Sequence, residues 1–189
     1  LAARLGDRIH LDSPVEALAQ HPEGGWRVHV RGSDAPASAD AVVVAIEGYK
    51  LAELELRDAR GERMFTGFFD ELSYPPMSML ALGFRRSQIE HPLDGFGVLV
   101  PSAEPFDILG AVFTSTIFPR RAPEGHVLMM AFVGGRDPEL AMLGEGEQLD
   151  LVVRDLDRLL GVRGQPIYAR RRLWERSIPQ YEVGYDRFL

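Results

Sequence analysis

The side chains that could bind a metal ion or act in acid–base catalysis are scattered along this chain. Its five histidines are His10, His21, His29, His91 and His126. No two of them are three or four positions apart, the spacing that places two ligands on one face of a helix. There is no cysteine, which excludes disulfides, thiolate metal sites and a cysteine nucleophile. We therefore predict no metal site and no histidine-based catalytic pair.

Serine, carboxylate and phosphate-binding motifs are equally absent. No serine lies in a G-x-S-x-G turn. Asp155 and Asp157 are two apart in a predicted helix, so they are not expected to share a proton. Gly95-Phe96-Gly97 lacks the third glycine of a dinucleotide-binding turn and opens no predicted helix. We therefore predict no catalytic residue, which suits a flavoenzyme, because there the cofactor accepts the hydride and the protein positions the substrate.

Composition and charge narrow the class of protein further. The 189 residues are 46% hydrophobic and 26% charged, enough for one sizeable core. The net charge is −7 and no basic stripe carries interleaved aromatics, so we exclude nucleic acid as a partner. No apolar run approaches the roughly 20 residues of a membrane-spanning helix. The chain begins without Met and inside a periodic pattern, so we expect a central piece of a longer protein.

The first part of the chain is expected to contain a hairpin and a buried strand. Residues 15–20 and 26–31 flank a turn rich in Pro and Gly, which predicts two antiparallel strands. The apolar run at 41–45 predicts a strand buried on both faces. Residues 8–11 are a short strand candidate, and residues 50–71 are expected to be partly helical.

The second part is expected to be a mostly antiparallel sheet with flanking helices. Apolar runs separated by turns predict its strands. A helix over 147–160 is predicted by helical spacing of its apolar residues, with Gly161 as its C-cap. We therefore assign the chain to the α+β class: a mostly antiparallel or mixed sheet with helices, plus a separate β-hairpin. The predicted strands are 77–84, 97–100, 109–113, 127–132 and 167–174.

From Tyr74 onward, an ordered set of segments resembles the FAD-dependent protoporphyrinogen oxidases of the flavin amine oxidase superfamily. The first 48 residues resemble members of the wider superfamily. The chain departs from the family at Ile46-Glu47-Gly48, where a Thr-Pro pair is usual, and at Gly184-Tyr185, where Gly-His is usual. The matching segments are Tyr74-Pro75-Pro76-Met77, residues 93–101, Phe118-Pro119, Phe132-Val133-Gly134-Gly135, and Trp174 with Ser177-Ile178-Pro179-Gln180-Tyr181.

This resemblance implies a division of the chain and a set of site residues. Residues 1–52 would be the returning part of a FAD-binding domain, with its β-hairpin and strand. Residues 53–173 would be the substrate-binding domain, and residues 174–189 the crossover back toward the FAD-binding domain. FAD would belong to the full-length protein and would not be held by this chain alone. The backbone of Val15 would meet the adenine end of FAD, and Trp174 would lie near the flavin. The residues implied to line the substrate cavity are Phe96, Gly97, Leu99, Val112 and Phe132.

The activity that the resemblance implies is oxidation of protoporphyrinogen IX to protoporphyrin IX in haem biosynthesis. Hydride would pass from the porphyrinogen to FAD, with oxygen as the acceptor. The alternatives are a coproporphyrinogen III oxidase, another FAD-dependent amine oxidase-like oxidoreductase, and a non-catalytic porphyrin-binding or interaction domain. The expected partner is a tetrapyrrole, and the expected location is the cytoplasm. Peripheral association with the cytoplasmic face of the membrane and a homodimer both stay open.

The run Arg170-Arg171-Arg172 admits two interpretations. Alternation along a strand sends Arg170 and Arg172 to one face and Arg171 to the other. The run is then either an ordinary solvated face or a site that attracts anionic groups, such as substrate propionates or anionic lipid.

Overall fold

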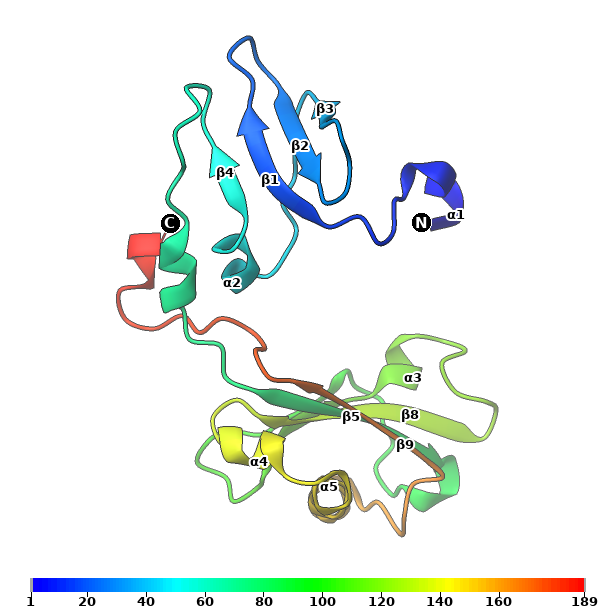
Figure 1. Cartoon of the computed structure of the whole chain (residues 1–189). Coiled ribbons are helices and arrows are strands. Elements are labelled where there is room, and N and C mark those ends of the chain that lie inside the picture. The colour runs from blue at the N-terminus through cyan, green and yellow to red at the C-terminus, as the bar shows by residue number, and fades with distance from the viewer. Residues whose placement is uncertain (1, 189) are drawn as a thin grey trace. The chain divides into compact units, whose positions relative to one another are not determined.

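The computed structural model describes residues 2–188, which form two compact units (Figure 1). One unit comprises residues 1–73 together with 181–189, and the other comprises residues 74–180. Each unit has its own β-sheet, and the helices are few, so the α+β class is confirmed. The domain boundaries implied by the family, after 52 and after 173, stay predictions.

The first unit is built on a four-stranded sheet in the order β3-β2-β1-β4. Strands β1 (Val15–Gln20) and β2 (Trp26–Val30) form the predicted antiparallel hairpin, with Gln20 opposite Trp26. Strand β3 (Ala37–Ala39) extends the sheet beside β2, and β4 (Glu55–Arg57) runs parallel to β1. The short helices of this unit are α1 (Ala2–Leu5), η1 (Gly6–Arg8), α2 (Gly48–Leu51), η2 (Gly67–Glu71) and η4 (Tyr185–Phe188).

Two predicted strands of this unit are wrong. Residues 8–11 lie outside any strand, and Leu11 is 79% exposed. The apolar run at 41–45 is also irregular, and Val43 is 90% exposed. A strand is buried on both faces only within a sheet that is covered on both sides. The run at 41–45 pairs with none of the four strands of this sheet.

The second unit is built on a five-stranded, fully antiparallel sheet in the order β6-β7-β8-β5-β9. Every strand predicted for this part of the chain is confirmed to within two residues. The long central pair, β5 and β8, stays in register from Met77 opposite Gly134 to Arg85 opposite His126. The strands are β5 (Met77–Arg85), β6 (Gly97–Leu99), β7 (Ile108–Val112), β8 (His126–Gly134) and β9 (Tyr168–Trp174).

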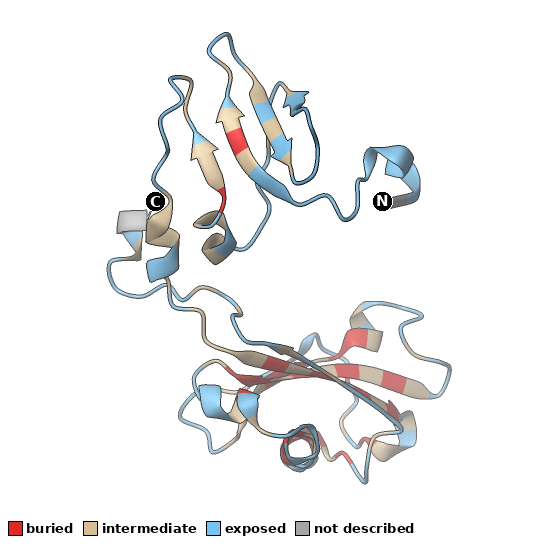
Figure 2. Ribbon diagram, in the orientation of Figure 1, coloured by how far each residue is buried: buried red, intermediate tan, exposed pale blue. Residues whose placement is uncertain are grey.

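Helix α5 (Glu145–Leu160) covers one face of this sheet. Its side chains Val152, Leu156 and Leu160 are at most 4% exposed and belong to one core with the alternate residues of β5 and β8. Figure 2 shows this alternation as buried and half-buried bands along both strands. The predicted C-cap is confirmed, because Gly161 adopts φ 63 and donates to the Asp157 carbonyl. The shorter helices are η3 (Arg86–Gln88), α3 (Thr114–Ile117) and α4 (Pro138–Met142).

A buried polar chain joins β9, β5, α4 and α5. Arg171 donates to the Ser78 hydroxyl at 2.9 Å and to the Ala141 carbonyl at 2.7 Å. Ser78 in turn donates to Gln148 at 2.8 Å, and the Gln148 amide donates to the Leu140 carbonyl. Ser78 and Gln148 are fully buried, so each relies on these bonds in place of water. The middle arginine of the run therefore points into the fold.

Candidate functional site

The face of the second sheet that points away from α5, hereafter the open face, carries the residues predicted to bind substrate. The strand register places two rows of residues across it. One row runs Leu99, Gly110, Phe132, Met79 and Arg172, and the other runs Gly97, Val112, Met130, Ala81 and Arg170. The non-glycine members are exposed or half-buried, whereas their neighbours on the α5 face, such as Leu80 and Ala131, are at most 2% exposed.

Three of the predicted substrate residues share this face across three neighbouring strands. Leu99 of β6 is 89% exposed, while Val112 of β7 and Phe132 of β8 are half-buried. None of the three is sealed inside the α5-covered core. Phe96, the fourth, precedes β6, is 72% exposed, and its carbonyl accepts the Phe113 amide at 3.0 Å. The face therefore presents exposed and half-buried apolar side chains over three strands.

Gly97, the fifth predicted residue, lies where β6 and β7 approach each other closely. A Cβ atom there would lie 2.3 Å from the Ala111 carbonyl oxygen. The mirrored position across the strand pair, Gly110, would place a Cβ 2.3 Å from the Val98 carbonyl oxygen. Both glycines are therefore required by the close approach of β6 and β7. The missing side chain of Gly97 makes room for β7. A contact between Gly97 and the substrate stays a prediction.

The same face carries a cavity that the sequence did not suggest. It has a volume of about 420 Å³ and lies beyond the two rows, toward the start of β9. Gly83, Leu128 and Tyr168 line it from three adjacent strands, with Arg121 and His126 among its other lining residues. None of the five predicted substrate residues lines it. Alternation over 167–174 could have signalled Tyr168, because it shares a parity with Arg170 and Arg172.

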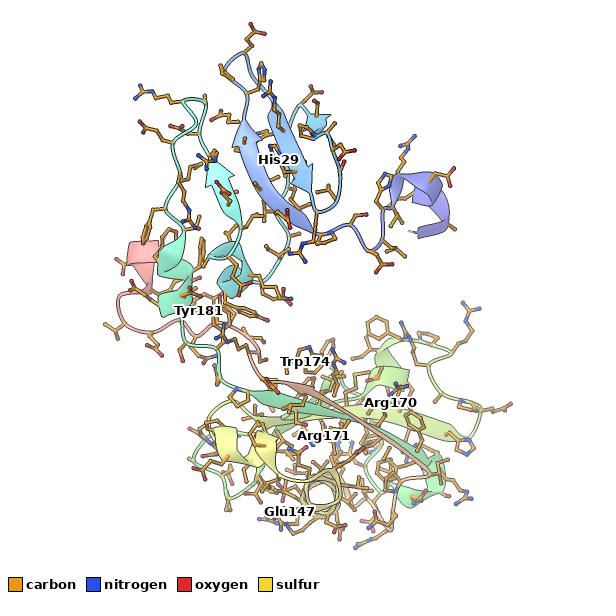
Figure 3. The ribbon with its side chains drawn as sticks, viewed as in Figure 1. His29, Glu147, Arg170, Arg171, Trp174 and Tyr181 are labelled. Carbon is orange, nitrogen blue, oxygen red and sulfur yellow. The ribbon has the colours of Figure 1, made fainter. Side chains whose placement is uncertain are left out.

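The edge strand β9 is cationic on the open face. Arg170 and Arg172 pair with Ala81 and Met79, and Arg172 lies 5.9 Å from the centre of the Trp174 ring. Figure 3 shows Arg171 on the α5 side of β9 and Arg170 on the opposite side. The alternation predicted for this arginine run is therefore confirmed.

The two residues predicted to contact the cofactor lie in different units. Val15 begins β1 and lies opposite Val30 of β2. On its other edge, β1 pairs with β4 only over residues 17–19, so Val15 is not paired with β4. Val15 also lines a cavity of about 270 Å³ together with residues 42–46. Trp174 ends β9 opposite Met77 and is 38% exposed. Their contacts with a cofactor stay predictions.

Neither titratable clusters nor shifted acids mark the open face. Among the described residues, no group of three His, Cys, Asp or Glu side chains could hold a metal ion. The pKa of Glu47 is lowered by a hydrogen bond with its own backbone and by Lys50, and the pKa of Arg163 is raised by its hydrogen bond with Glu90. None of these residues belongs to the two rows. Within residues 2–188, no helix is long and apolar enough to cross a membrane.

Comparison with known proteins places this arrangement in a family. All 189 residues match the model of the flavin containing amine oxidoreductases. The chain is 34% identical, over 95% of its length, to protoporphyrinogen oxidase 2, chloroplastic/mitochondrial, of Arabidopsis thaliana. It is 37% identical, over 80% of its length, to the mitochondrial protoporphyrinogen oxidase of Nicotiana tabacum. The structure of a reduced UDP-galactopyranose mutase is similar in fold, with a TM-score of 0.71 at 10% identity over 99% of the chain and 39% of the mutase.

These relatives are longer than the chain, which spans 37% of the Arabidopsis enzyme and 31% of the tobacco enzyme. The family match nevertheless runs from the first residue to the last and includes both sheets. The chain therefore belongs to the flavin containing amine oxidoreductase family.

Proposed function

We propose that the full-length protein is a FAD-dependent oxidase that converts protoporphyrinogen IX to protoporphyrin IX. The observation that carries the proposal is the identity of 34–37% with two protoporphyrinogen oxidases over most of this chain. The apolar open face supports it, because a porphyrinogen is a broad ring that needs apolar walls. The absence of an acid–base pair from the two rows supports it as well, because the flavin accepts the hydride when bound.

Leu99, Val112 and Phe132 are assigned to the walls of the substrate site. They come from three adjacent strands and face the same way, so one broad ligand can touch all of them. Each Å² of apolar surface that such a ring buries contributes roughly 25 cal/mol. The aromatic face of Phe132 adds a stacking contact. These side chains would orient the ring and exclude water, while Phe96 would close one end.

The residues assigned to FAD fit only part of that cofactor. The backbone of Val15 is assigned to the adenine end, and Trp174 to the neighbourhood of the flavin. The pyrophosphate needs a helix N-terminus free of negative charge. Within residues 2–188 the one helix longer than five residues is α5, and its first turn carries Glu145 and Glu147. The pyrophosphate site is therefore assigned to a part of the full-length protein outside this chain.

An anaerobic reduction experiment tests the proposal. The full-length protein, loaded with FAD, is mixed with protoporphyrinogen IX, coproporphyrinogen III or a primary amine, and flavin absorbance near 450 nm is followed. We expect the fastest bleaching with protoporphyrinogen IX. Protoporphyrin fluorescence should rise once oxygen is admitted, because the flavin must be reoxidised between the three two-electron steps. Faster bleaching with coproporphyrinogen III or with the amine would overturn the substrate assignment. A flavin that no porphyrinogen reduces would overturn the activity itself. Peripheral membrane association and a homodimer stay predictions.

A further inference from the structure

We infer that Arg170 and Arg172 form a carboxylate-binding edge of the open face, which holds the carboxylate arms of an otherwise apolar ring. The inference rests on the proposed function for the identity of the ring. It assigns a separate task to two residues outside the apolar wall. The ligand it requires is amphipathic: a broad apolar body with carboxylates along one side.

The strand register places each arginine at the end of an apolar row. Arg172 follows Phe132 and Met79, and Arg170 follows Met130 and Ala81. Adjacent strands are about 4.8 Å apart, so β9 lies roughly 10 Å from β8 across the face. That separation matches the reach from the centre of a large ring to its acid arms. Because β9 is the edge strand, both guanidinium groups can extend along the rim of the face.

Among the described residues, Arg170 and Arg172 lack the side-chain bonds that several arginines of this unit form, and Arg120 and Arg121, in the loop before β8, lack them as well. Arg171 is committed to Ser78 and Ala141, and Arg163 is paired with Glu90 and Asp157. Within residues 2–188, neither Arg170 nor Arg172 forms an ion pair or a hydrogen bond through its side chain, although acidic residues outnumber basic ones by 28 to 21. Two exposed arginines without carboxylate partners, beside apolar half-buried side chains, are suited to a bidentate bond with an external anion.

The number and type of the cations favour a small dicarboxylate over an anionic membrane surface. Attraction to anionic lipid relies on clusters of about four to eight Lys or Arg residues. The two rows of the open face contain only Arg170 and Arg172, the cavity on the same face adds Arg121, and the single lysine of the chain, Lys50, lies in the other unit. A guanidinium also matches the planar geometry of a carboxylate, whereas lipid attraction requires only positive charge. We therefore commit to the carboxylates of the ring.

The test compares a diacid with its diester in the full-length, FAD-loaded protein. The variants are Arg170→Gln, Arg172→Gln and the double variant, and the substrates are protoporphyrinogen IX and its dimethyl ester. We expect the double variant to raise KM for the diacid by about tenfold or more, with kcat within about twofold and KM for the diester unchanged. Arg172→Lys should restore part of the loss. Equal changes for the diacid and the diester, or no change for either, would overturn the inference.

A matched control and a second readout keep the result interpretable. Arg163→Gln removes the same charge from an exposed, paired arginine and should leave both KM values unchanged. Binding of protoporphyrin IX and of its dimethyl ester is also titrated by porphyrin fluorescence. If the wild-type protein oxidises no porphyrinogen, the proposed function fails. The inference is then decided by whether the double variant loses the preference of the protein for the diacid.

The same variants distinguish a lipid surface from a bound carboxylate. Sedimentation with vesicles containing phosphatidylserine is measured for the wild type and the double variant. We expect no difference between them. Loss of vesicle binding in the double variant, together with an intact preference for the diacid, would overturn the carboxylate assignment in favour of lipid.

Discussion

Gly97 of β6 and Ala111 of β7 lie so close together that a methyl group on Gly97 would sit 2.3 Å from the Ala111 carbonyl oxygen. That carbonyl belongs to the backbone of a central part of the sheet, so it cannot move aside as the end of a side chain would. The pairing of β6 with β7 positions Leu99 on the open face. The glycine therefore acts on the candidate site through the backbone.

Gly97→Ala should separate β6 from β7 and lower the stability of the full-length protein. Relief of a backbone clash of this size costs about 1–3 kcal/mol, and it would displace Leu99. We expect a lower thermal midpoint and a higher KM for the substrate. Gly95→Ala is the matched control, because a Cβ there meets nothing within 4 Å. If both variants unfold at the wild-type temperature, the close approach of β6 and β7 is not a constraint.

Arg171→Met should destabilise the second unit, whereas Arg170→Met should not. Loss of the Arg171 guanidinium leaves Ser78 and the Ala141 carbonyl without a donor in a buried setting. An unsatisfied buried polar group costs about 1–3 kcal/mol. Arg170 is exposed, so its removal should leave the unfolding midpoint unchanged. Urea unfolding of the full-length variants measures the difference, and equal midpoints would contradict the separation of roles.

Much of this fold was predictable because the signals are local. Apolar runs separated by turns identified all five strands of the second sheet, and alternation sent Arg171 to the face opposite Arg170. The run at 41–45 was misassigned because burial of a strand on both faces depends on neighbours, which the residues of the run do not specify. The side of the sheet covered by α5 was unpredictable for the same reason. The sequence placed Leu99 and Gly97 on one face. It did not show that β7 packs too closely against Gly97 to leave room for a side chain, because that depends on the distance between two backbones.

Asp155 should be required for stability, whereas its neighbour Asp157 should not. Asp155 is fully buried and accepts the amides of Asp107 and Ile108 at 2.7 and 3.2 Å. Asp155→Ala leaves the two amides at the start of β7 without this acceptor. The expected cost is about 1–3 kcal/mol for each buried donor. Asp157→Ala removes only an exposed ion pair with Arg163 and should be nearly neutral. Thermal unfolding measured by circular dichroism compares the two, and an equal loss would contradict the assigned role.

The 189-residue chain alone should not retain FAD. The acidic first turn of α5 opposes a pyrophosphate, and no dinucleotide-binding glycine turn is present in the sequence. After incubation with FAD and gel filtration, we expect the protein fraction to be colourless at 450 nm. The full-length protein, treated in the same way, is the positive control. A yellow, stoichiometric complex of the chain alone would contradict the assignment of the pyrophosphate site to another part of the protein.

Phe132→Ala in the full-length protein should weaken substrate binding without affecting the cofactor. Phe132 lies in the middle of the open face, on β8, with Gly110 of β7 on one side and Met79 of β5 on the other. Glycine at position 110 leaves the aromatic ring uncovered on the β7 side. The ring is therefore available to a pyrrole ring of the substrate, and its removal takes away stacking area and apolar surface. We expect KM for protoporphyrinogen IX to rise about tenfold, because the lost contact is made before the chemical step.

The control for this variant is Phe106→Ala, which removes the same side chain from the α5-covered side. Phe106 packs under the Arg158 guanidinium at 4.1 Å and belongs to neither row of the open face. KM should therefore stay at its wild-type value in that variant. FAD content, measured from the ratio of absorbance at 450 and 280 nm, should be unchanged in both. If Phe132→Ala loses FAD, or if KM rises equally in the two variants, the open face is not the substrate wall and Phe132 is an ordinary packing residue of the sheet.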